Sequence, residues 1–366
     1  MKIGILTFHY AINQGAVLQA YALQEAIRKL GHDVEFVDYR PRYPVKLRDF
    51  IAKSPVTAYE KTLNTIIGFW WQEVLDCFGK INKRGSVRYR SDRELFANPP
   101  LYDAYVVGSD QVWNFTNSLN PAYLMEWVPS DRRVISYAAS MGQCVIPEAF
   151  HDHIRHDLSR FAAISLREKK ARDFVASLLP DKEIVQTVDP TLLLSSNDFQ
   201  RIIEPVSVDD EYVATYILSI LEPAHRDILD KVKNVTHLRI VNLRNPSTCV
   251  FLYGRNEKNK IVTPYQWLDY IQKSKYVVCS SFHAVVFSLI FHKPFLVIMP
   301  LSSRNNGGNV RILSLLEPLG LSSHCIYESE GNNVEKILND DIDWETVERK
   351  LLELRNSSLD FLRMAL

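Results

Sequence analysis

Residues 276–298 constrain the fold more than any other part of the sequence. An apolar run at Tyr276–Cys279 predicts a buried strand, and the short polar turn that follows it ends in His283. Ala284–Phe291 then predicts a helix, and Pro294 begins another apolar strand. In parallel α/β sheets, ligands bind just beyond the C-terminal ends of the strands. His283 is therefore expected at the mouth of a sheet, beside helix N–H groups that suit a phosphate or carboxylate; the alternative is a plain helix cap.

The same alternation of strands and helices recurs along the chain and predicts an α/β protein with parallel sheets. Strands are expected at residues 3–8, 34–37, 105–108, 134–139, 162–166, 212–219, 238–243 and 295–299, and helices at residues 15–30, 264–273, 310–316 and 344–354. A chain of 366 residues is too long for one compact core, which predicts two domains.

We expect the boundary between these domains near residues 185–200. Residues 1–187 then form the N-terminal domain, with an insertion near residues 41–100, where prolines and an aromatic helix break the alternation. Residues 188–342 form the C-terminal domain, and the helix in residues 343–366 is a candidate to pack back on the first domain. Two parallel sheets that face each other would leave a central cleft lined by loops from both.

Charge and cysteine content exclude several classes of function. Lys+Arg and Asp+Glu both number 43, which argues against a nucleic-acid partner. The five cysteines are scattered without a Cys-x-x-Cys pair, which indicates a reduced, cytoplasmic chain. The N-terminus is not typical of a signal peptide, and the apolar stretch at 284–301 is interrupted by charge and proline, so no membrane span is predicted. His151, His153 and His156 are interpreted as a solvated helix face, and no metal is predicted.

Two loops after predicted strands carry polar side chains that suit a small polar ligand. The loop at residues 7–15 precedes a helix, and the loop at residues 108–114 combines an acid and two amides with a tryptophan, as sugar sites do. The candidates for binding an acceptor are His9, Asn13, Gln14, Gly15, Ser109, Gln111, Trp113 and Asn114. Capped turns with no ligand are the alternative for both loops.

Arginines mark two further candidate sites. Arg167 stands where a buried strand ends, and its planar fork suits a carboxylate or a phosphate, whereas a structural ion pair with Glu168 is the alternative. The loop that contains Arg304, Asn305 and Arg311 follows a strand and precedes a helix. It is expected either to close over an anion or to be an ordinary surface loop.

Together these segments resemble the polysaccharide pyruvyl transferase family. The resemblance is carried by Asn13–Leu23, Tyr105–Asn114, Ile164–Arg167, Val188–Leu193, Ser280–His283 and Lys293–Phe295. It implies two Rossmann-like domains facing a central cleft, similar to GT-B glycosyltransferases. It also implies a reaction in which phosphoenolpyruvate gives its enolpyruvyl group to two hydroxyls of a sugar, in a polysaccharide or its lipid-linked precursor. The products would be a pyruvate ketal and phosphate.

The resemblance assigns roles to residues of this chain. His283 and Arg167 match a histidine and an arginine that family members use, and Asp110 or Asp189 is the candidate acid or base. Contacts to the donor are expected from Ser281, Phe282, Arg304, Asn305 and Arg311. Some members have Arg-Leu-His where this chain has Ser281-Phe282-His283, so one donor-binding arginine is either absent or supplied by Arg304 or Arg311.

The expected partners are phosphoenolpyruvate as a substrate and a sugar acceptor, with no cofactor and no nucleic acid. A lipid-linked acceptor would bring a cytoplasmic enzyme into peripheral contact with the inner membrane surface. Two alternatives stay open: a nucleotide-sugar-dependent glycosyltransferase of GT-B architecture, and a sugar-binding relative without catalysis.

Overall fold

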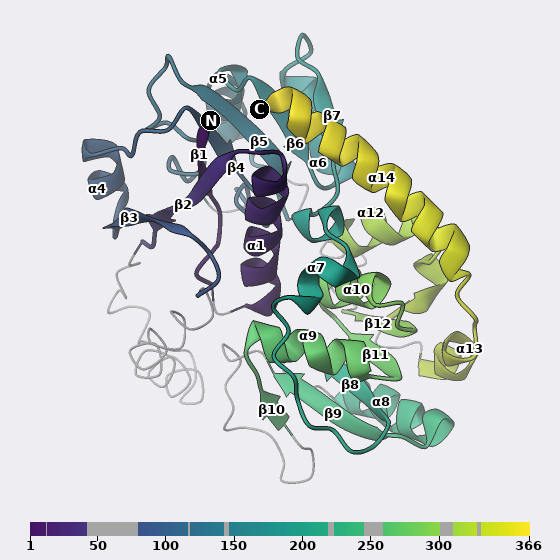
Figure 1. The fold of residues 1–366 in the computed structure, drawn as a ribbon. Helices are drawn as coiled ribbons and strands as arrows, with labels where there is room; N and C mark the ends of the chain where they lie inside the picture. The colour runs from purple at the N-terminus through teal and green to yellow at the C-terminus, as the bar shows by residue number, and fades with distance from the viewer. Residues whose placement is uncertain are drawn as a thin grey trace, which may run out of the picture.

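Two parallel β-sheets with flanking helices form the protein (Figure 1). The computed structural model describes residues 1–11, 13–41, 80–115, 118–142, 146–218, 223–244, 259–300, 310–327 and 331–366. Within these ranges, one sheet has seven strands in the order β3-β2-β1-β4-β5-β6-β7 and the other has six in the order β10-β9-β8-β11-β12-β13. In both sheets the chain starts in the middle and winds outward in two directions, as Rossmann folds do. The prediction of an α/β fold with two Rossmann-like domains is confirmed.

The first sheet and its helices use residues from the N-terminal half. Its strands are β1 (Lys2–Leu6), β2 (Asp33–Tyr39), β3 (Arg84–Tyr89), β4 (Ala104–Val107), β5 (Arg133–Ala139), β6 (Ala163–Leu166) and β7 (Ile184–Gln186). The accompanying helices are α1 (Gln14–Lys29), α4 (Asp92–Ala97), α5 (His151–Ser159) and α6 (Lys169–Leu178). All four residues of the central strand β4 are buried, because helices cover both faces of the sheet.

Part of the segment that the sequence set aside as an insertion belongs to this sheet. Within residues 41–100, β3 pairs in parallel with β2 and forms the edge of the sheet, and α4 follows it. The apolar pattern misses β3 because it is polar and mostly exposed, as suits an edge strand. Residues 42–79, which include Trp70 and Trp71, lie outside the described residues.

The second sheet repeats the pattern in the C-terminal half. Its strands are β8 (Tyr212–Tyr216), β9 (Arg239–Arg244), β10 (Asn259–Ile261), β11 (Tyr276–Cys279), β12 (Phe295–Met299) and β13 (Cys325–Tyr327). The helices around it are α8 (Pro223–Thr236), α9 (Pro264–Lys273), α10 (Phe282–Ile290), α12 (Val310–Leu319) and α13 (Val334–Leu338). The connection from the first sheet contains the 3-10 turn η2 (Pro190–Leu193) and α7 (Ser196–Gln200).

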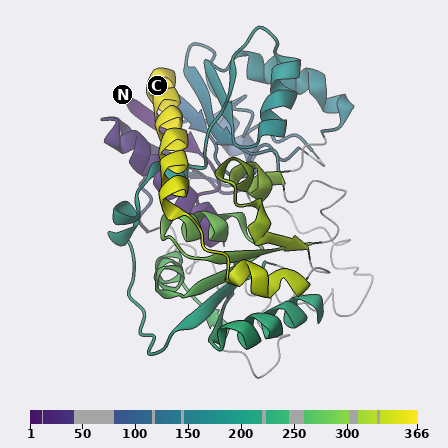
Figure 2. The ribbon, with the colours of Figure 1, turned by 90° about the vertical axis from the view of Figure 1, so that its right-hand side faces the viewer.

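The last helix, α14 (Trp344–Ala365), runs along both sheets (Figures 1 and 2). Val347 and Leu351 on its first half pack in the core of the second sheet. Phe361 and Leu362 on its last half pack in the core of the first sheet, and the carbonyl of Ala365 accepts a hydrogen bond from Arg133 Nε (2.6 Å). The C-terminal helix thus joins the two domains.

No helix in the described part of the chain combines the length and the apolar composition that crossing a bilayer requires.

Candidate active site

Arg167, Asp189 and His283 meet at one carboxylate oxygen between the two sheets. Arg167 Nη1 donates to Asp189 Oδ2 (2.7 Å), and His283 Nε2 lies 3.5 Å from the same oxygen. All three side chains are buried. Arg167 and His283, which are 116 positions apart in the sequence, are thereby brought to one point.

The fold places each of the three at the end of a strand or the start of a helix. Arg167 directly follows β6, and Asp189 stands between β7 and η2. Asp189 Oδ1 accepts hydrogen bonds from the backbone N–H (3.1 Å) and the hydroxyl (2.7 Å) of Thr191, which fixes its carboxylate. His283 lies in the first turn of α10, directly after β11. This confirms the strand–turn–helix expected around His283.

Glu168 holds Arg167 from the other side. Arg167 Nε donates to Glu168 Oε1 (3.0 Å), and Ser140 Oγ donates to the same oxygen (2.7 Å). The guanidinium carbon of Arg167 also lies 4.5 Å from the ring centre of Phe282, within cation–π range. The ion pair between Arg167 and Glu168, which was the alternative interpretation of the sequence, is therefore present. It fixes the position of Arg167 at the site.

Several buried polar atoms of this cluster have no hydrogen-bond partner among the described residues. They are Arg167 Nη2, Glu168 Oε2 and His283 Nε2. A buried polar atom without a partner costs about 1–3 kcal/mol, so proteins rarely leave several together. Arg167 Nη2 is a donor and His283 Nε2 can carry a proton, so these two atoms suit an anionic ligand.

Opposite charges set the protonation of the cluster. Burial alone would raise the pKa of Asp189, but the adjacent His283, Arg167 and Thr191 outweigh it and hold that pKa well below its usual range. Burial opposes the charge of Arg167, yet Glu168 and Asp189 raise its pKa above the ordinary value. The carboxylate and the guanidinium therefore stay charged at neutral pH.

A small cavity of about 120 Å³ opens beside this cluster. Arg167 and Asp189 line it together with Phe282 and Arg311. Burial and the nearby charge of Arg167 lower the pKa of Arg311, because two like charges in a buried place repel each other. Of the predicted donor-binding residues, Phe282 and Arg311 are thus placed at the cavity. Ser281 stands directly before α10 without a side-chain cap hydrogen bond, and Arg304 and Asn305 lie outside the described residues.

A second, more open hollow of about 490 Å³ lies beyond the end of β4. Asp110, Gln111 and Asn114 line it, as the sequence predicted for a polar loop after this strand. Trp113 does not, because its indole is fully buried in the core and donates to the carbonyl of Tyr123 (3.0 Å). The expectation that Trp113 contacts an acceptor is therefore wrong: the ring is large and apolar, and packing under the loop removes it from water.

The start of α1 brings a glycine against the histidine of the other domain. A β-carbon at Gly15 would lie 2.1 Å from His283 Nδ1, so no larger residue fits without displacement. Asn13 caps α1 by accepting a hydrogen bond from the backbone N–H of Ala16 (3.2 Å). Gln14 is fully buried, and its Oε1 accepts a hydrogen bond from the hydroxyl of Tyr216 on β8 (2.5 Å). Gly15 and Gln14 thus join the two domains beside the site.

Two other predicted acceptor residues are part of the protein interior. His9 is fully buried, with Nε2 3.0 Å from Asp38 Oδ1. Ser109 is also buried, and its hydroxyl donates to the carbonyl of Ala138 (3.0 Å) and lies 3.4 Å from Asp189 Oδ2. A sugar therefore cannot reach His9 in this structure. Ser109 instead lies beside the carboxylate of Asp189 in the interior.

Sequence reasoning missed the residues that support the site from neighbouring elements. Ser140, Thr191 and Tyr216 each make one of the hydrogen bonds described above. Thr191 had a local signal, because an aspartate two residues before it often bonds the following backbone. Ser140 and Tyr216 had none, since their partners are distant in the sequence.

Similarity to solved structures concerns the fold alone. Arabidopsis thaliana UGT89C1 complexed with quercetin has a TM-score of 0.51 at 9% identity, covering 99% of this chain and 98% of that chain. Methanocaldococcus jannaschii UDP-GlcNAc 2-epimerase in complex with UDP-GlcNAc and UDP has a TM-score of 0.49 at 14% identity, covering 97% and 99%. Spinosyn rhamnosyltransferase SpnG has a TM-score of 0.45 at 11% identity, covering 100% and 99%. The first of these agrees with the predicted GT-B-like architecture.

Comparison with curated protein sequences gives no match. The family model of polysaccharide pyruvyl transferases, in contrast, matches residues 13–302, which include Arg167, Asp189 and His283. Because this match spans most of the chain and contains the whole buried cluster, the protein belongs to the polysaccharide pyruvyl transferase family and is a transferase.

Proposed function

We propose that the protein transfers the enolpyruvyl group of phosphoenolpyruvate onto two hydroxyls of a sugar. The product is a cyclic pyruvate ketal on a polysaccharide or its lipid-linked precursor, and phosphate is released. The observation that carries the proposal is the buried cluster of Arg167 and His283, with unpartnered polar atoms beside a small cavity that Arg311 also lines. Two arginines and a histidine suit a small ligand with a carboxylate and a phosphate.

The size of the cavity favours this donor over a nucleotide sugar. Sites for larger organic ligands typically enclose about 300–1,000 Å³, whereas the described residues around Arg167 enclose about 120 Å³. Phosphoenolpyruvate has only three carbons and a phosphate. The larger hollow at Asp110 is the proposed place of the sugar acceptor.

The reaction requires one acid, one base and cations. Protonation of the methylene carbon makes C2 electrophilic, and the first sugar hydroxyl adds to C2 and loses its proton. The bond from C2 to the phosphate oxygen then breaks, and phosphate leaves with the bonding electrons. The second hydroxyl adds to the same carbon, loses its proton and closes the ketal. One released proton balances the proton used at the methylene, and the other leaves with phosphate.

The electrostatics separate the roles of the two candidate aspartates. Asp189 is held ionised by Arg167 and His283, so it is a poor proton donor and acts by positioning those two side chains. Asp110 is partly exposed and lines the open hollow, where a sugar hydroxyl would reach it. We therefore assign acid–base chemistry to Asp110, the grip on the donor to Arg167 and Arg311, and the contact with the departing phosphate to His283.

Phosphate release from phosphoenolpyruvate tests the proposal. The full chain is incubated with phosphoenolpyruvate and pools of candidate acceptors from bacterial cell-envelope polysaccharides, and phosphate is measured. His283→Ala is expected to lower release by about 10²–10⁴-fold, the usual contribution of a positioned acid or base. His292→Ala removes a half-exposed histidine that lies 3.4 Å from Glu348, and it should leave release unchanged.

Binding measurements separate the proposal from its alternatives. Phosphoenolpyruvate should raise the thermal midpoint of the wild-type chain, and nucleotide sugars should not. A midpoint raised only by a nucleotide sugar would support the glycosyltransferase alternative. Binding of acceptor sugars without any phosphate release would support a non-catalytic relative.

A further inference from the structure

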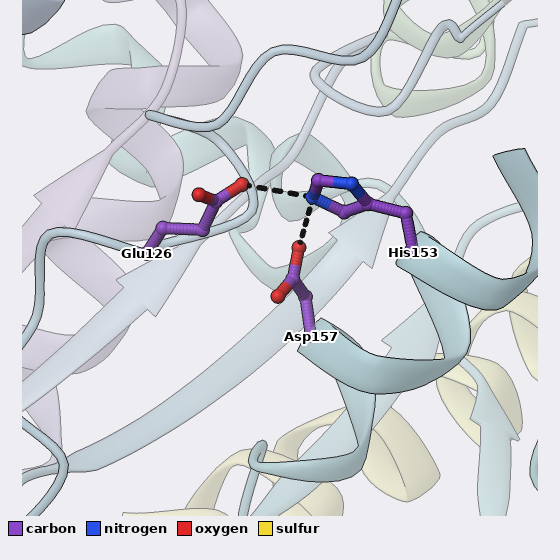
Figure 3. A group of neighbouring side chains, drawn as sticks. All are labelled: Glu126, His153 and Asp157. Carbon is purple, nitrogen blue, oxygen red and sulfur yellow. Dashed lines mark hydrogen bonds and ion pairs between the residues drawn. The ribbon is translucent and has the colours of Figure 1, made fainter.

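One histidine nitrogen faces two carboxylates on the surface of the first domain (Figure 3). His153 Nε2 lies 3.2 Å from Glu126 Oε1 and 2.9 Å from Asp157 Oδ2. His153 and Asp157 are one turn apart on α5, and Glu126 comes from the segment between β4 and β5. The sequence could pair only residues of the helix itself, so it predicted a solvated face at this position.

Hydrogen bonds alone cannot satisfy both carboxylates, because a single N–H group faces the two of them. An imidazole Nε2 carries at most one hydrogen, and it can donate that hydrogen well to only one of the two carboxylates. Asp157 is 4% exposed, yet its Oδ2 makes no hydrogen bond with the described residues. A buried carboxylate oxygen without a donor is costly unless a cation lies beside it.

The distances fit a tetrahedral metal ion. With bonds of about 2.0–2.2 Å to nitrogen and oxygen, ligand atoms around zinc are separated by about 3.3–3.6 Å. The three ligand atoms all lie within 4.8 Å of one another. The separation of His153 from Glu126 (3.2 Å) is near the tetrahedral value, and that from Asp157 (2.9 Å) is shorter. His156 Nδ1 lies 3.0 Å from Asp157 Oδ1, so it orients the carboxylate from outside, as outer partners of metal ligands do.

We infer that Glu126, His153 and Asp157 bind a zinc ion, with water as the fourth ligand. An imidazole with two carboxylates suits zinc better than magnesium or calcium, which prefer oxygen ligands alone. None of the three residues lines either cavity of the candidate active site. An ion bound there would fasten α5 to the segment that follows the loop with Asp110.

Titration of the chelator-treated full chain with zinc chloride tests the inference. Calorimetry should detect one equivalent of Zn²⁺ bound, and the thermal midpoint should rise with its concentration. His153→Ala should weaken binding by more than about a hundredfold, because loss of an outer partner alone costs 10–100-fold. Glu126→Gln, which keeps the shape of the side chain but removes its charge, should weaken binding as well. Both positions are at least partly exposed, so both variants should fold.

The matched control is His292→Ala, which removes another half-exposed histidine near a single carboxylate, that of Glu348. It should bind zinc as the wild type does. Absence of zinc binding to the wild type, or equal binding by His153→Ala, would overturn the inference and leave an ordinary ion pair at this place.

Discussion

At the scale of single residues, Asp189 organises the candidate active site. Its carboxylate accepts hydrogen bonds from Arg167 and Thr191 and lies beside His283. Each partner belongs to a different element, so this one side chain fixes the relative positions of three. Asp189 is thus more important to the geometry of the site than its place in a short Asp-Pro-Thr turn indicates.

Asp189→Asn is expected to lower the free energy of unfolding at pH 7 by about 1–3 kcal/mol, because it removes one of the two carboxylates that pair with the buried Arg167, while Glu168 remains. The pKa of Asp189 is lower in the folded chain than in the unfolded chain. Its contribution is therefore complete above the unfolded pKa of about 3.9 and is lost as the pH falls below it. Urea unfolding at several pH values should show the difference between wild type and variant shrinking below about pH 4.

Asp360→Asn serves as the control, because Asp360 lies on the surface and pairs only with the exposed Arg363 among the described residues. It should change the unfolding free energy by less than about 1 kcal/mol at any pH. An Asp189→Asn variant as stable as the wild type at pH 7 would show that the carboxylate does not hold the cluster together.

At the scale of elements, the start of α1 lies against the start of α10. Gly15 costs α1 up to about 1 kcal/mol relative to alanine in helix propensity. Its missing side chain leaves room for the ring of His283. Gly15 therefore lowers the stability of α1, but its missing side chain lets a histidine of the other domain lie against the helix.

Gly15→Ala should lower phosphate release by about a hundredfold, because a displacement of about 1 Å at a reacting group can cost that much. The added carbon would lie 2.1 Å from His283 Nδ1 and must displace the ring or separate the helices. Steady-state kinetics and circular dichroism would separate loss of activity from loss of helix.

Gly331→Ala is the matched control, since its added carbon would meet the flexible end of Lys231 at 3.0 Å and Ile228 Cγ1 at an ordinary contact distance of 3.5 Å. It should keep wild-type rates. Wild-type rates in Gly15→Ala as well would exclude a tight fit at His283 as a requirement for turnover.

At the scale of the whole molecule, α14 connects the two sheets. Its two halves pack in different cores, so the relative position of the domains depends on this helix as well as on the Gln14–Tyr216 hydrogen bond. A site between two domains requires them to keep a fixed relative position, and a helix of 22 residues holds them so in this chain.

Leu362→Ala is expected to lower the free energy of unfolding by about 2–5 kcal/mol, as other fully buried leucines do. Met364→Ala changes a residue two positions away that is 77% exposed, and it should cost less than about 0.5 kcal/mol. Denaturant unfolding measures both values. Equal small effects would mean that the end of α14 does not contribute to the first core.

The sequence predicted the central strands of both sheets and several helices, because their apolar periodicity is local. β3 was missed because it is a polar edge strand, and β7, β10 and β13 because they contain only three residues each. The apolar pattern reports burial along one segment, so it cannot find strands that are short or largely exposed.

By itself, the sequence determined the fold class, the family motifs and the positions of Arg167 at the end of a strand and His283 at the start of a helix. Only the tertiary structure decided that these two meet at one oxygen of Asp189, that Trp113 and His9 are buried, and that Glu126 faces His153. The physical reason is range: periodicity and turn chemistry act over a few neighbouring residues, whereas contacts between side chains of distant elements depend on how two sheets and their helices pack.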